Sequence, residues 1–291
     1  AGPTGAGKTD LALRLALRHG GEIVGADAFQ LYAGFPLLSA QPTAAQRAGV
    51  PHHLVGCVDP AEPFDAGRWL WAAQHVLADI AARGRRPIMV GGTGLYVKAL
   101  LGGLDELPGN DPALREELAG MDLPALVERL RVLDPEAVRA VDCANRRRVE
   151  RALEIVTLTG KPLAASRTGS ASLPGVRGLL VTRDREELDA RIAANVEAMF
   201  REGVESEAAA LPEECVGPTA SRMLGLAELR ALGRREISRE EAVRRITSAT
   251  RRYARRQLTW FRNQHDFPVL NLSHFPDPET AITEASRLLA C

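Results

Sequence analysis

Lysine and cysteine are both scarce in this chain, and neither scarcity favours a particular partner. Only three lysines, Lys8, Lys98 and Lys161, occur among the 37 Lys and Arg residues. An arginine excess of this kind is typical of a GC-rich coding sequence, so arginine abundance alone is weak evidence for nucleic-acid binding. The four cysteines form no C-x-x-C pair, which excludes the usual zinc and disulfide patterns. Reduced cysteines favour a cytoplasmic protein.

The sequence also lacks any apolar run of membrane-spanning length, and no signal peptide is visible. We therefore expect no membrane partner. The formal net charge is zero, which excludes no class of ligand.

The most specific feature present is a glycine-rich loop of the pattern G-x-x-x-x-G-K-T. Such a loop points its backbone N–H groups inward at phosphate oxygens, and the helix after it adds its positive end. This predicts a site for a di- or triphosphate, the ligand class of nucleotide-binding and ATP-binding proteins. We expect the Thr9 hydroxyl to bind Mg²⁺. The predicted diphosphate contacts are Gly2, Pro3, Thr4, Gly5, Ala6, Gly7, Lys8 and Thr9.

The order of the predicted elements indicates an α/β protein. Apolar runs at Glu22–Asp27, Pro87–Val90 and Gly178–Thr182 read as strands, and amphipathic helices lie between them. Residues 111–170 contain only helical patterns, such as the proline-started helix after Asp111. We predict a P-loop-type doubly wound parallel sheet, formed by residues 1–110 and 171–291, with 111–170 as a small inserted helical domain. Only Ala1 precedes Gly2, so we expect the strand that feeds the loop to be missing from this sequence.

Asp27 follows the first predicted strand and is the candidate acidic residue of the site. In phosphate-loop proteins an acid at such a position often organises magnesium. A helix cap is the alternative interpretation. The second candidate segment, Gly91–Gly94, reads as a tight turn after its strand, which is compatible with a role in a site.

Two clusters of arginine indicate a polyanionic partner. Arg146, Arg147 and Arg148 lie in the first turn of a predicted helix, where the helix dipole disfavours cations. The second cluster runs through Arg244–Arg262 with no acid inside it, and Tyr253, Trp260 and Phe261 are interleaved with the arginines. Aromatic and arginine side chains together suit stacking on unpaired bases. The alternative for both clusters is a solvated face, with the aromatic residues turned into the core.

These features together resemble the tRNA dimethylallyltransferases, also called tRNA isopentenyltransferases, over essentially the whole chain. The resemblance rests on ordered motifs: GPTGAGKT at the start, Ala26–Tyr32 (ADAFQLY), Val50–Leu54 (VPHHL), Gly91–Tyr96 (GGTGLY), Arg151–Glu154 (RALE) and Arg255–Arg262 (RRQLTWFR). The chain differs from the usual family pattern at Ala28, Asn195 and Leu226.

The resemblance implies transfer of a dimethylallyl group from dimethylallyl diphosphate to N6 of adenine 37, in the anticodon stem-loop of tRNA. The loop then holds a leaving diphosphate, assisted by Mg²⁺ and Arg191, while Asp27 and Thr93 act on the adenine amine. We expect a monomer. The implied tRNA contacts are Asp27, Phe29, Gln30, Thr93, Arg115, Arg147, Arg148, Arg151, Arg222, Gly225, Arg255, Arg256, Gln257, Trp260 and Arg262.

Three other classes share part of this pattern. A small-molecule kinase would have the phosphate loop but not the basic, aromatic-rich helix. A prenyltransferase acting on free AMP would not need the helical insertion or the arginine stripe. A pure RNA-binding module would leave Asp27 and Thr93 without a purpose.

Overall fold

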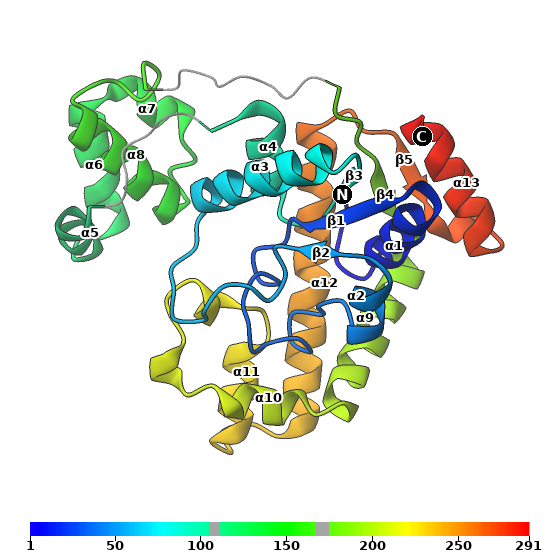
Figure 1. Cartoon of the computed structure of the whole chain (residues 1–291). Coiled ribbons are helices and arrows are strands. Elements are labelled where there is room, and N and C mark those ends of the chain that lie inside the picture. Colours follow the sequence, from blue (N-terminus) through cyan, green and yellow to red (C-terminus); the bar gives the residue numbers. More distant parts are fainter. Residues whose placement is uncertain (105–110, 167–174, 291) are drawn as a thin grey trace. The chain divides into compact units, whose positions relative to one another are not determined.

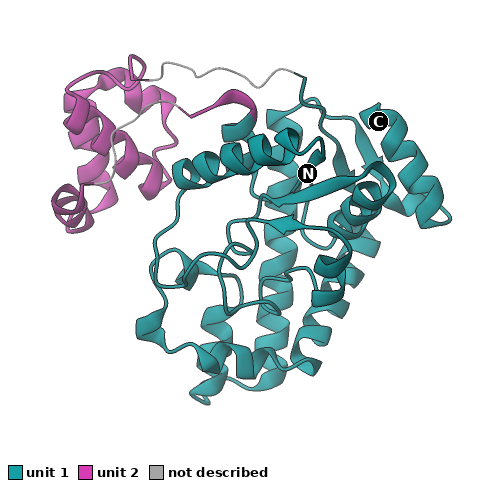
Figure 2. Ribbon diagram, in the orientation of Figure 1, with its two compact units in different colours: residues 1–100, 174–291 teal, residues 101–173 magenta. Residues whose placement is uncertain are grey.

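The computed structural model describes residues 1–104, 111–166 and 175–290, and its course is drawn in Figure 1. The chain divides into two compact units, Ala1–Leu100 with Pro174–Cys291, and Leu101–Leu173 (Figure 2). The predicted domain boundaries, after 110 and after 170, fall at or inside the segments 105–110 and 167–174, which lie outside the described residues.

Parallel strands form the framework of the first unit. The strands are β1 (Gly21–Gly25), β2 (His52–His53), β3 (Arg86–Val90), β4 (Leu180–Thr182) and β5 (Val269–Asn271). In the described residues they make a three-stranded sheet of order β2-β1-β3 and a two-stranded sheet of β4 and β5, with every pairing parallel. The predicted parallel α/β organisation is confirmed, although the described strands fall into two sheets rather than one.

The helices of the first unit follow the order expected for strand–helix alternation. They are α1 (Lys8–His19), α2 (Ala44–Gly49), α3 (Ala66–Ala82), α4 (Gly94–Gly102), α9 (Arg185–Arg201), α10 (Val204–Ala210), α11 (Leu226–Gly233), α12 (Arg239–Gln264) and α13 (Pro278–Leu289), with short 3₁₀ turns at Glu213–Cys215, Ala220–Arg222 and Leu272–His274.

Alternation along β1 explains why helices cover both of its faces. Ile23, with its register partner Ile88, packs against α1 in one apolar cluster. Met89, the register partner of Val24, packs instead in the cluster that contains Trp69 of α3. Successive strand residues point to opposite faces, so α1 and α3 lie on opposite sides of the sheet. All of β1 is buried as a result, which is typical of a central parallel strand.

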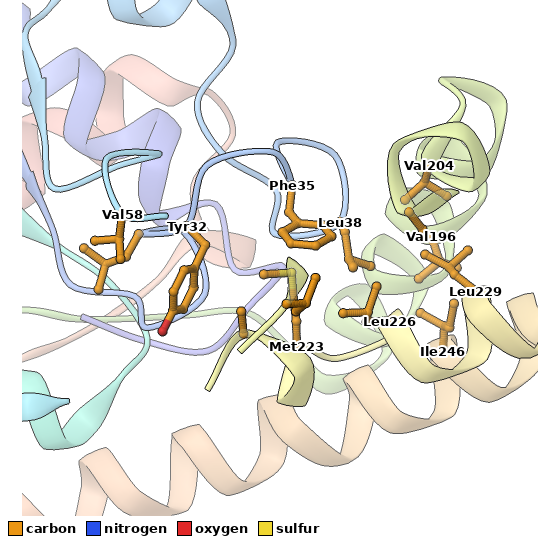
Figure 3. Packing of buried hydrophobic residues seen from close by; sticks show 14 of the residues in the cluster. Tyr32, Phe35, Leu38, Val58, Val196, Val204, Met223, Leu226, Leu229 and Ile246 are labelled. Atoms are coloured by element: carbon orange, nitrogen blue, oxygen red, sulfur yellow. The ribbon is translucent and has the colours of Figure 1, made fainter. Parts of the chain in front are cut away.

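The largest apolar cluster joins the chain after β1 to the C-terminal helices. Figure 3 shows Tyr32, Phe35 and Leu38 on one side, with Leu226 of α11 and Ile246 of α12 on the other. These five side chains are at most 8% exposed. The cluster fixes α12, the long orange helix of Figure 1, beside α9 and α11.

The second unit is helical in its described part. Its helices are α5 (Pro112–Ala119), α6 (Leu123–Leu133), α7 (Pro135–Ala140) and α8 (Arg146–Thr159). Leu118, Leu126, Leu130 and Leu153 are almost fully buried and form its own core.

Helix starts agree well with the capping residues in the sequence. Asp65, Asp111 and Asn145 each accept a hydrogen bond from the N–H three residues on, which is the usual bond of an N-cap side chain. Ser238 does so at α12, but the predicted capping box is only half formed, because the Glu241 carboxylate bonds to Arg244 and Arg245 instead.

Two features that bear on compartment and partners are also visible. No helix in the described part of the chain is both long and apolar enough to cross a membrane. Cys57, Cys143 and Cys215 are free thiols.

Candidate active site

The carboxyl ends of β1 and β3 are tied together just where the candidate residues follow them. The Ala26 N–H donates to the Val90 carbonyl at 2.8 Å, and the Thr93 N–H donates to the Ala26 carbonyl at 3.1 Å. The Thr93 hydroxyl oxygen in turn accepts from the Ala28 N–H at 2.9 Å. These bonds hold Thr93 alongside the backbone that carries Asp27.

The glycine-rich loop leads into α1 as the sequence predicts. Gly7 is the N-cap, with φ 92°, a left-handed conformation that glycine adopts without a steric penalty. No side chain caps this helix end, so the N–H groups of the first turn of α1 remain available to an anion, whereas the Thr4 and Ala6 N–H groups of the loop already bond to Gln257 and to the Pro3 carbonyl. The Lys8 ammonium donates to the Pro3 carbonyl at 2.6 Å, which folds its side chain back over the loop.

Two arginines, one in α9 and one just before it, donate hydrogen bonds to carbonyls of this loop. The Arg191 Nε donates to the Gly5 carbonyl at 3.1 Å. Arg183, just before α9, donates to the Ala6 carbonyl at the same distance and is paired with Glu187. Arg191 was predicted as a diphosphate contact. Arg183 was not, because no motif marks it.

Asp27 and Lys8 are both half-buried, and their opposite charges influence each other's pKa. Burial raises the pKa of the Asp27 carboxyl, while the hydrogen bond from the Phe29 N–H and the charge of Lys8 oppose the rise. Burial lowers the pKa of Lys8 to about 8, against the attraction of Asp27. A carboxylate with a raised pKa is a better proton acceptor than an ordinary aspartate. The arrangement suits proton removal beside a bound anion.

The predicted RNA-binding residues near this site have different surroundings. The Gln30 amide donates to the carbonyls of Ser39 and Ala40, and Phe29 is partly exposed. Arg222 is exposed at the end of a 3₁₀ turn.

Helix α12 has exposed arginines on one side and buried side chains on the other. Arg255, Arg256 and Arg262 are exposed; Arg255 lies 3.7 Å from Asp189, and Arg256 lies over the Tyr253 ring. The stripe is shorter than the sequence suggested, since Arg244 and Arg245 are both bonded to Glu241.

Three interpretations on α12 and α11 need correction. Phe261 is fully buried, so it offers no ring for base stacking. Gln257 is 5% exposed, and both ends of its amide are bonded inside the protein. Gly225 is buried against Leu38 and Ile246, where it caps α11 with φ 94°. Neither Gln257 nor Gly225 presents a surface to tRNA.

The predicted cations of the second unit form two groups: two arginines bond to a buried carboxylate, and two others lie at the surface. Arg115 and Arg151 both bond to Glu154, which is 2% exposed. Burial raises the pKa of Glu154, but the hydrogen bonds from Arg115 and Arg151 outweigh it and leave the pKa below its ordinary value. Arg147 and Arg148 are exposed, and Arg148 lies 3.8 Å from Asp142.

Arg146 has a structural reason for its place in the first turn of α8. Its guanidinium donates to the carbonyls of Leu118 and Ala119 at the end of α5, and also to that of Met121. A cation at a helix C-terminus is favourable. The clustering of three arginines here therefore does not by itself require an external polyanion.

The oxygen donors near the glycine-rich loop fit magnesium better than a metal that needs many protein ligands. Among the residues that the structure describes, no group of three or more His, Cys, Asp or Glu side chains is placed to hold a metal. Mg²⁺ keeps several waters and often takes only one or two protein oxygens together with substrate phosphates. The Thr9 hydroxyl at the start of α1 and the Asp27 carboxylate, which senses the charge of Lys8, fit that modest requirement.

Comparison with known proteins gives one consistent result. A family model described as IPP transferase matches residues 30–264. A tRNA dimethylallyltransferase from Anaeromyxobacter sp. (strain K) is 47% identical over 271 residues, covering 91% of this chain and 89% of that protein.

Two solved structures are similar over nearly the whole chain. The full-length tRNA isopentenylpyrophosphate transferase from Bacillus halodurans has a TM-score of 0.73 and 34% identity, covering 99% of this chain and 93% of that one. A eukaryotic dimethylallyltransferase acting on tRNA has a TM-score of 0.84 and 25% identity, covering 98% and 76%. With the motifs, the fold and the site in agreement, the chain belongs to the tRNA dimethylallyltransferase family.

Proposed function

We propose that this protein transfers the dimethylallyl group of dimethylallyl diphosphate to N6 of adenine 37 in tRNA and releases diphosphate. The observation that carries the proposal is that the Thr93 turn, bonded to the backbone on both sides of Asp27, and the Lys8 ammonium on the glycine-rich loop bring a carboxylate and a cation within range of each other's charge. This places a proton acceptor next to an anion site.

The diphosphate is proposed to lie on residues Gly2–Thr9, which act as a P-loop. The allylic C–O bond breaks towards a resonance-stabilised cation, and negative charge grows on the departing diphosphate. Lys8 and the loop N–H groups stabilise that charge, which is the main electrostatic contribution available here. Arg191, anchored on the Gly5 carbonyl, is positioned to reach the same anion.

The acceptor is the exocyclic amine of adenine, whose lone pair is delocalised into the ring. The amine nitrogen forms the new C–N bond as the C–O bond breaks, and its proton passes to Asp27. The Thr93 hydroxyl holds the amine in line. The base must leave the anticodon-loop stack to reach these groups.

Magnesium is the proposed cofactor, with Thr9 as the residue to hold it. When bound, the ion adds positive charge at the diphosphate oxygens and so favours departure of the leaving group.

Arginines supply most of the proposed RNA contacts. They come from α12, from the 3₁₀ turn of Arg222 and from the helical unit at Leu101–Leu173, which we propose as an insertion that binds the anticodon stem-loop. Their cationic side chains suit phosphate contacts, which position an RNA without reading its sequence. The proposed contacts are Arg115, Arg147, Arg148, Arg151, Arg222, Arg255, Arg256 and Arg262, with Phe29, Gln30 and Trp260 near the flipped base. We further propose that the protein acts as a monomer on cytoplasmic tRNA.

A labelling experiment tests the reaction and its acceptor. With isotope-labelled dimethylallyl diphosphate, an anticodon stem-loop carrying A37 should become labelled and the same stem-loop with G37 should not. Labelling of free AMP at a comparable kcat/KM would favour the AMP-type prenyltransferase. ATP turnover without prenyl transfer would favour a kinase.

The charges of Lys8 and Asp27 also predict the pH dependence of kcat/KM for dimethylallyl diphosphate. Lys8 must keep its proton to attract the diphosphate, so kcat/KM should fall as the pH rises through about 8. Asp27 must be unprotonated, and its raised pKa places the acidic fall above the ordinary value of 3.8. Steady-state kinetics across this range measures both limbs, because kcat/KM reports the free enzyme. A kcat/KM that stays level well above pH 8 would contradict the role of Lys8.

A further inference from the structure

The inward face of α12 contacts both loops of the proposed active site. Tyr253, Gln257 and Trp260 follow the spacing i, i+4 and i+7, so they share one side of the helix. This is the side opposite to the exposed Arg255 and Arg262. The inward side chains therefore contact the protein, whereas the arginines face solvent.

Gln257 bridges the two loops with its amide group. Its Oε1 accepts from the Thr4 N–H at 2.9 Å, and its Nε2 donates to the Gly92 carbonyl at 2.9 Å. Thr4 belongs to the diphosphate loop, and Gly92 immediately precedes Thr93. Because the bridge needs one acceptor and one donor, neither leucine nor ionised glutamate can replace both bonds.

Two neighbouring side chains hold the same turn. A Cβ added to Gly94 would lie 2.2 Å from Cε3 of Trp260, so the indole ring packs directly on the turn backbone. The Tyr253 hydroxyl lies close to the side chains of Thr93 and Gln257. Burial, and then the charge of Asp27, raise the pKa of Tyr253, which keeps its proton.

We propose that Gln257 is a positioning residue that sets the distance between the diphosphate loop and the Thr93 turn. This rests on the proposed function, in which the two loops hold the two substrates. The allylic carbon and the adenine amine react only when these loops are correctly spaced, and a misplacement of about 1 Å can cost about 10²-fold in rate. Gln257 does so without contacting RNA, since it is 5% exposed and bonded on both sides.

The test compares Gln257→Leu with Gln264→Leu. Gln264 lies in the last turn of the same helix and is exposed, and its Oε1 accepts from the Lys98 ammonium at 3.2 Å. We expect Gln257→Leu to lower the single-turnover rate at saturating substrates by about 10- to 10²-fold, by loss of alignment. The Kd of a stem-loop RNA should change less than about twofold, and Gln264→Leu should match the wild type. A weaker RNA affinity with an unchanged rate would overturn the proposal in favour of an RNA contact.

A second variant guards against simple misfolding of the first. Gln257→Glu keeps the acceptor for Thr4 and loses the donor to Gly92, with little change in shape. It should also slow the single-turnover rate while leaving the circular dichroism spectrum native. A native-like Gln257→Glu with the wild-type rate would overturn the bridge.

A double-mutant cycle with Thr93→Ala separates positioning from general destabilisation. If Gln257 acts through the Thr93 turn, Gln257→Leu should slow Thr93→Ala by less than about twofold, because coupled sites are not additive. Full additivity of the two rate losses would overturn the proposal. Thr93→Ala alone tests the catalytic assignment: a normal rate there would remove Thr93 from the proposed function, while the Gln257→Leu comparison would still decide the bridge.

Discussion

Replacing Lys8 with alanine should lower the rate of dimethylallyl transfer by about 10²-fold or more and leave RNA affinity nearly unchanged. The physical reason is that the ammonium group lies over the glycine-rich loop, bonded to the Pro3 carbonyl, where we propose that the diphosphate binds. The charge that grows on the leaving group then loses its closest cation. Single-turnover transfer and RNA binding, measured on the same preparation, give both quantities.

Lys98 supplies a matched control for this experiment. It is an exposed lysine on α4 whose ammonium bonds to Gln264, away from the glycine-rich loop. Lys98→Ala should transfer at the wild-type rate. If Lys8→Ala instead lost RNA affinity as strongly as rate, the loop would not be the diphosphate site.

Replacing Asp27 with asparagine should keep both substrates bound and lose about 10²- to 10⁴-fold in the chemical step. Asparagine has the same size and still accepts a hydrogen bond, so the bond from the Phe29 N–H can persist. It cannot take the proton of the adenine amine at neutral pH. A fall in kcat with unchanged substrate affinity is the expected signature.

A magnesium titration distinguishes this role from metal binding. If Asp27 were only a magnesium ligand, it would be needed for diphosphate affinity, and excess Mg²⁺ would restore the transfer rate of the variant. As a general base it would be needed at every concentration of the ion. Single-turnover transfer by Asp27→Asn across the titration decides between them, and rescue by Mg²⁺ would refute the general base.

Local signals in the sequence were sufficient for several of the helix starts. The caps at Asp65, Asp111 and Asn145 mark helix starts because a side-chain oxygen next to a free N–H is a purely local interaction. The start of α6 carries the same kind of signal, because Asp122 caps the helix and a proline follows in its first turn.

The partners of polar side chains could not be predicted in the same way. The pattern around Gln257 reads as a basic surface helix, and only the fold reveals that Thr4 and Gly92 lie within reach of its amide. In the sequence Arg146 has no visible partner, and only the structure shows that its guanidinium bonds to the carbonyls at the end of α5. Both contacts join residues far apart in the sequence, so periodicity and propensity carry no information about them.

The separation of α12 into an outward and an inward face bears on how this enzyme could be re-engineered. A library that randomises 252, 255, 256, 259 and 262, all exposed, would sample a range of RNA affinities without disturbing the loops. The inward side chains Tyr253, Gln257 and Trp260 would be held fixed, because Trp260 packs against Gly94 and Gln257 holds both loops. One helix thus offers a designer a variable surface on a constant support, much as an antibody loop region sits on its framework.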